Sequence, residues 1–167
     1  MRSSLIEKIK RVQALPRSED LEFFPEAYEL HPYRRPEPDE MEVPDSYRQF
    51  LEIAPGGAGL GDVSLYGWGV LREEGRKHAA AHPERKDRFF HFGNWLGEAL
   101  LMMRGTDIVF IERDDSVPPE EWGRLDEIAP FTEFLDQFVL GPRYVELAGT
   151  LEREDPWWNL LENLGFR

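Results

Sequence analysis

Apolar residues recur at helical spacing along residues 43–54. Positions i, i+3, i+4 and i+7, which share one face of a helix, hold Tyr47, Phe50, Leu51 and Ala54. Pro44 suits the first helical position, where the backbone N–H has no hydrogen-bond partner within the helix. The sequence Pro-Gly-Gly at 55–57 ends the helix. The pattern predicts a helix over residues 43–54 with one buried face.

The same spacing predicts three further helices. One covers residues 5–15, where the apolar positions are Leu5, Ile6, Ile9 and Val12. Another covers residues 130–140, where the shared face holds Phe131, Phe134, Leu135 and Phe138. The last covers residues 155–165, with Asp155 as the cap and Gly165 at the end. Trp157 and Trp158 are adjacent there, so at most one indole can be centred on the buried face.

Short apolar runs at residues 62–68, 89–92, 98–103 and 108–113 predict strands. Turn residues separate the last three runs, which is typical of an antiparallel meander. The charged segment 71–88 predicts a short exposed helix and a loop. The Gly-rich segment 56–61 predicts a turn in which two backbone segments pass close together.

These elements predict an α+β protein, with a twisted, mainly antiparallel sheet packed against flanking helices. A doubly wound α/β fold is disfavoured, because the strands follow one another without crossover helices. The chain length suits one domain over residues 1–167. Six prolines punctuate residues 16–44, so an extended acidic connection is expected there.

The net charge of the chain indicates which classes of molecule it could bind. The chain has 33 Asp and Glu against 20 Lys and Arg, a formal net charge of −13. Nucleic acid and anionic membranes are therefore poor partners, whereas a basic protein would be attracted. The chain has no cysteine, which excludes thiolate catalysis and disulfides. Neither a membrane span nor a signal peptide is recognisable, so a cytoplasmic protein is expected.

Histidines provide the main candidates for chemistry. His78 and His82 are four residues apart, so a helix would place both on one face, as in a two-histidine zinc motif. That motif also needs a base and a third ligand. Glu74 lies one turn before His78, but the segment is Ala-rich, exposed in pattern and followed by Pro83, which favours a solvated helix instead. His91 alternates with two phenylalanines and is expected to be a solvated or hydrogen-bonded strand histidine. No nucleophile elbow or phosphate-binding glycine loop is present, so we expect no catalytic residue, cofactor or metal.

Acidic and aromatic residues provide candidates for binding a partner. The acidic candidates lie in and around a Pro-containing loop and are Glu112, Asp114, Asp115, Glu120 and Glu121. The aromatic candidates lie near predicted strand ends and turns and are Tyr66, Trp68 and Trp95. Such aromatics fill cores or anchor interfaces, and the sequence leaves both alternatives open.

Three segments together resemble the SUKH superfamily, which includes the Smi–Knr cell-wall-assembly-regulator-like proteins. They are Val43-Pro44-Asp45-Ser46-Tyr47-Arg48-Gln49-Phe50-Leu51 with Pro55-Gly56-Gly57, then Asp62-Val63-Ser64-Leu65-Tyr66-Gly67, and Ala129-Pro130-Phe131-Thr132-Glu133-Phe134-Leu135. The resemblance spans roughly residues 43–140 and implies an α+β domain without catalytic residues. Many bacterial members look like immunity proteins that neutralise secreted toxins, often nucleases, and fungal members act as interaction proteins in cell-wall signalling.

The expected function is therefore a non-catalytic, acidic binding protein of the immunity type, whose partner is a basic toxin domain. The alternative is a regulatory or scaffold domain of the cell-wall-regulator type. A metal-dependent enzyme that uses His78, His82 or His91 is the least favoured hypothesis. The sequence makes no prediction of the oligomeric state.

Overall fold

A single antiparallel sheet organises the protein. The structure is a computed structural model that describes residues 1–15, 41–113, 118–148 and 155–167. Six strands pair in chain order, each with the next: β1 (Gly57–Leu60), β2 (Val63–Tyr66), β3 (Phe89–Trp95), β4 (Glu98–Met103), β5 (Ile108–Glu112) and β6 (Leu125–Pro130). The α+β class and the single domain are confirmed. Most of the predicted 16–44 connection, together with Asp114 and Asp115, lies outside the described residues.

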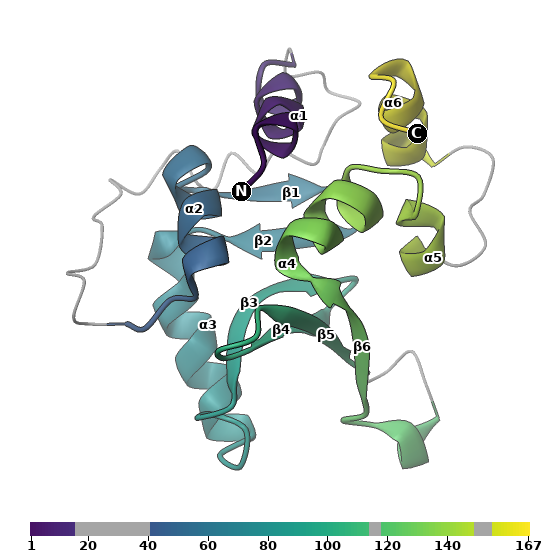
Figure 1. Cartoon of the computed structure of the whole chain (residues 1–167). Coiled ribbons are helices and arrows are strands. Elements are labelled where there is room, and N and C mark those ends of the chain that lie inside the picture. The colour runs from purple at the N-terminus through teal and green to yellow at the C-terminus, as the bar shows by residue number, and fades with distance from the viewer. Residues whose placement is uncertain (16–40, 114–117, 149–154) are drawn as a thin grey trace.

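Helices lie on several sides of this sheet (Figure 1). Their bounds are α1 (Ser3–Gln13), α2 (Asp45–Ile53), α3 (Trp68–Ala81), α4 (Phe131–Glu133), α5 (Tyr144–Ala148) and α6 (Pro156–Asn163), with short helical turns η3 (Pro119–Glu121) and η4 (Phe134–Val139). In Figure 1, α1 and α6 lie at the end of the molecule near β1, and η3 lies at the opposite end. No helix in the described ranges is long and apolar enough to cross a membrane.

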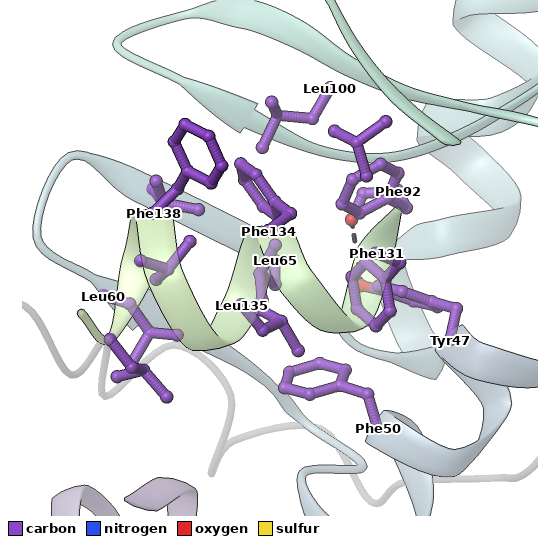
Figure 2. Close-up of a cluster of buried hydrophobic side chains, with 14 of the residues drawn as sticks. Tyr47, Phe50, Leu60, Leu65, Phe92, Leu100, Phe131, Phe134, Leu135 and Phe138 are labelled. Carbon is purple, nitrogen blue, oxygen red and sulfur yellow. Dashed lines mark hydrogen bonds between the residues drawn. The ribbon is translucent and has the colours of Figure 1, made fainter. Parts of the chain in front are cut away.

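Aromatic side chains join the helices to the sheet (Figure 2). The Tyr47 ring on α2 lies 5.2 Å from the rings of both Phe92 on β3 and Phe131 on α4. Its hydroxyl lies 2.6 Å from the carbonyl oxygen of Tyr66 and 2.9 Å from that of Phe92. This buried phenol therefore shares its single proton between backbone acceptors on two neighbouring strands while its ring packs in the core.

Local sequence patterns account well for α2 and α6. Helix α2 begins after Pro44, and its expected apolar face is buried. At α6 the Asp155 side chain accepts a hydrogen bond from the backbone N–H of Trp158, which is the predicted cap. Trp157 is buried and Trp158 only half-buried, as their adjacency requires.

Other elements differ from the expectations. Residues 57–60 form β1 rather than a turn, although the expected close approach is present: a Cβ on Gly57 would lie 2.3 Å from the Leu65 carbonyl oxygen. The predicted helix over 130–140 is α4 followed by η4, a stretch of π-helix. The longer α3 replaces the short helix predicted within 71–88. Strand β6 and helix α5 were not predicted at all, because neither carries a clear apolar period.

Candidate functional site

The C-terminal end of α3 meets the end of β5 in a cluster of titratable side chains. His78 lies in the last turn of α3 and His82 is the capping residue directly after it, with the two rings 4.9 Å apart. Glu112 is the last residue of β5 and reaches the same place. One ligand atom from each of these three side chains lies within 4.8 Å of the others, and no other such group of three is found among the described residues.

Glu112 is the centre of this His–Glu cluster. Its side chain is only 7% exposed, and its Oε2 lies 2.8 Å from Nε2 of His78. Its Oε1 accepts a hydrogen bond from Nη1 of Arg85 and lies 3.6 Å from Nε2 of His82. Burial by itself raises the pKa of this carboxyl, but the His78 hydrogen bond and the neighbouring cationic groups outweigh burial and hold the pKa below its usual range. Glu112 is therefore an ionised, buried carboxylate.

A pocket with a volume of about 460 Å³ opens beside the cluster. Its lining residues are His78, His82, Arg85, Gly97, Ala99, Glu112, Arg113, Trp122 and Gly123. Arg85 bridges its two sides, because Nη2 donates to the carbonyl oxygen of Gly123 at 2.8 Å while Nη1 bonds Glu112. At the rim, the Trp122 side chain is 54% exposed.

His91 lies behind the cluster and outside the pocket lining. Its ring is 4.9 Å from that of His78. Its Nε2 is 2.9 Å from the Gly93 carbonyl oxygen, and its Nδ1 is 3.4 Å from the Glu74 carbonyl oxygen. Burial, with a smaller contribution from His78, lowers the pKa of His91. The expected hydrogen-bonded strand histidine is confirmed, and a backbone carbonyl oxygen lies near each of its ring nitrogens.

A second buried carboxylate lies one strand away. Glu98 on β4 accepts a 2.8 Å hydrogen bond from Nη1 of Arg113, whose Nε donates to Asp126 on β6, also at 2.8 Å. The Arg113 guanidinium also lies 5.3 Å from the centre of the Trp95 ring. Arg113 thus links three strands and covers an aromatic side chain.

The predicted binding residues separate into two groups. Tyr66, Trp95 and Glu112 are each less than a tenth exposed, so of the two alternatives left open for Tyr66 and Trp95 the structure shows core packing. Tyr66 packs its ring edge-on against His91, Trp95 lies under Arg113, and Glu112 points into the His–Glu cluster.

The remaining predicted residues lie nearer the surface. Trp68 is half-buried against the core, Glu120 is exposed and Glu121 is partly exposed. Sequence reasoning missed the exposed Trp122 between the acidic η3 and β6. An indole in an otherwise polar, Pro-containing loop was the available signal, since loop residues do not need aromatic side chains for packing.

Comparison with known protein families, curated proteins and solved structures finds no match for this chain. The SUKH resemblance therefore stays a prediction.

Proposed function

We propose that this protein is a non-catalytic binding domain of the immunity type, which neutralises a basic toxin domain through an acidic surface. The observation that carries the proposal is the location of the negative charge. The formal net charge is −13, and among the described residues only two carboxylates, Glu98 and Glu112, are buried. Both accept hydrogen bonds from arginines inside the fold. The other described carboxylates are exposed or half-exposed, so their charge faces solvent.

One part of this surface combines charge with an aromatic anchor. We name it the acidic edge and define it as Glu120, Glu121, Trp122, Asp126 and Glu127. It runs from η3 along β6, the last strand in the sheet order. Trp122 is more than half exposed within it. Interfaces concentrate binding energy in such aromatic residues, and acidic side chains around them would favour a basic partner.

The charges of the acidic edge are held in place by Arg124. Its side chain bonds both Glu121 and Asp126, and the Asp126 contact measures 2.8 Å. This hydrogen bond, with burial opposing and Arg113 adding to it, keeps the pKa of Asp126 below its usual range. Asp126 therefore stays ionised at neutral pH. A nuclease toxin carries a basic surface to hold nucleic acid, and an ordered acidic edge would cover such a surface.

The test pairs the purified protein with the basic toxin domain encoded beside its gene. We expect a complex whose association slows as salt is added, and protection of cells that co-express both proteins. The variant E120K/E127K should slow association by about tenfold at low salt. The matched control is E7K, an exposed site on α1 at the other end of the molecule (Figure 1). W122A should speed dissociation more than it slows association.

Two results would overturn this proposal. Absence of both complex and protection would remove the immunity function. Equal effects of E120K/E127K and E7K would show that the acidic edge is not the interface. A complex with another cellular protein, without protection from the toxin, would favour the regulatory or scaffold alternative instead.

A further inference from the structure

We propose that His78, His82 and Glu112 form a binding site for one divalent transition-metal ion, with Zn²⁺ as the ion to be tested. The site would use Nε2 of each histidine and one carboxylate oxygen. This donor set suits zinc, which binds imidazole nitrogen and carboxylate oxygen at about 2.0–2.2 Å. The inference does not depend on the identity of the protein partner proposed above.

The donor atoms lie close enough for small side-chain rotations to bring them around a tetrahedral ion. Zinc–ligand bonds of this length place neighbouring ligand atoms about 3.3 Å apart. In the structure, Oε2 of Glu112 lies 2.8 Å from Nε2 of His78, Oε1 lies 3.6 Å from Nε2 of His82, and one ligand atom from each of the three side chains lies within 4.8 Å of the others. Small rotations of the side chains would therefore admit the ion. The His82 side chain is 35% exposed at the end of α3, so its ring can turn with little loss of packing.

The two oxygens of Glu112 have different partners. Oε1 is bonded by Arg85, whereas Oε2 faces His78. Oε2 is thus available to the ion while Arg85 continues to orient the carboxylate through Oε1. Hydrogen bonds to the second oxygen of a ligating carboxylate are a regular feature of metal sites, because they hold the ligand in its binding orientation.

The need for a positive charge beside Glu112 does not explain why two histidines lie next to it. Arg85 already supplies one positive charge for the single negative charge of Glu112. The rings of His78 and His82 lie 4.9 Å apart beside the same carboxylate. Two imidazoles that converge on one buried carboxylate are an arrangement that a zinc ion stabilises.

Three protein ligands leave one coordination position, and the adjacent pocket provides room for it. The pocket volume is about 460 Å³. One molecule of liquid water takes up about 30 Å³, so the pocket has room for a water ligand. Water or a side chain of a bound protein could complete the coordination sphere. Sites that retain such an open position differ from closed structural zinc sites.

The experiment uses the full chain without a polyhistidine tag, after treatment with a chelator. Calorimetric titration with Zn²⁺ should show one saturable site per chain. H82A and E112Q should each weaken binding by at least about tenfold, since even loss of an outer-shell partner has that effect. The matched control is E73Q, which changes an exposed carboxylate on the same helix and should bind zinc as the native chain does.

Thermal unfolding provides a second measurement. Zn²⁺ should raise the unfolding temperature of the native chain and of E73Q, but not that of H82A. Circular dichroism confirms folding, and H82A is the safer variant because His82 is partly exposed. Absence of saturable binding to the native chain would overturn the proposal. Unchanged zinc affinity in a folded H82A protein would overturn it equally, because the ion would then be bound elsewhere.

Discussion

The hydroxyl of Tyr144 on α5 lies 3.3 Å from Oδ2 of Asp62, in the turn between β1 and β2. The same hydroxyl lies 3.5 Å from the Asp62 backbone nitrogen, so the contact ties together segments 82 residues apart. Burial raises the pKa of Asp62, the Tyr144 hydrogen bond opposes this, and the nearby Asp155 adds to the rise. Burial and the same two carboxylates raise the pKa of Tyr144 as well. Ionised Asp62 is therefore less favourable in the folded state than in the unfolded chain.

The raised pKa of Asp62 predicts a stabilising substitution. Folding binds this proton more tightly, so stability declines as pH rises from 3.8, the ordinary pKa, through the higher folded value. D62N keeps an oxygen acceptor for Tyr144 and removes the charge. We expect D62N to be more stable than the native chain at neutral pH, with the difference vanishing at about pH 3. Urea unfolding across a pH series measures this.

D126N is the matched comparison, with the opposite sign. The Arg124 hydrogen bond lowers the pKa of Asp126 in the folded state, burial opposes this, and Arg113 adds to the lowering. Its stabilising effect is present above the ordinary pKa of 3.8 and is lost as pH falls through the folded value. D126N should therefore be less stable than the native chain at neutral pH. Equal pH profiles for D62N and D126N would contradict both assignments.

Removal of the Tyr47 hydroxyl should weaken the junction between α2 and the sheet. Y47F leaves the ring in place but removes the donor that lies near the carbonyl oxygens of Tyr66 and Phe92. A buried acceptor without a partner costs about 1–3 kcal/mol, which is the expected loss in the free energy of unfolding. T106A, which removes an exposed hydroxyl bonded to Met103, is the control and should change stability by less than about 0.5 kcal/mol.

Loss of Arg113 should be more harmful than loss of an arginine at the surface. R113A removes the guanidinium that bonds buried Glu98, and breaking a buried pair on one side costs about 3–5 kcal/mol. The double variant R113A/E98A should recover part of this loss, because no charge then stays buried. R143A breaks an exposed pair with Glu146 and should have little effect. Chemical denaturation of the four proteins tests the comparison.

Two glycine substitutions should act in opposite directions. A Cβ on Gly93 would lie 2.3 Å from the backbone oxygen of Ser64 on the neighbouring strand, so G93A must displace backbone. We expect a loss of about 3 kcal/mol. Gly75 lies inside α3, and a Cβ there would meet nothing within 4 Å. G75A should therefore stabilise the protein by about 1 kcal/mol, and a lower unfolding temperature for G75A would contradict this.

Much of the core was predictable because the relevant forces act over a few residues. The apolar period of Tyr47, Phe50 and Leu51 is a property of one helix, and all three side chains are buried. The Asp155 cap lies three residues from the N–H that it accepts. By contrast, β6 contains two adjacent acidic residues and a proline, which do not favour a strand. It forms a strand because its backbone pairs with β5.

Local spacing along the chain was sufficient to determine the α+β class, the helix faces and the acidic character, since each depends on neighbours in sequence or on composition. Folding alone brought Glu112 to His78, 34 residues earlier in the chain, and buried Tyr66 and Trp95. The meander decides which strand ends adjoin which helix, and burial depends on what packs above each face. Strand–helix adjacency and burial both depend on contacts between residues far apart in the sequence. The residue pattern within one segment therefore cannot predict them.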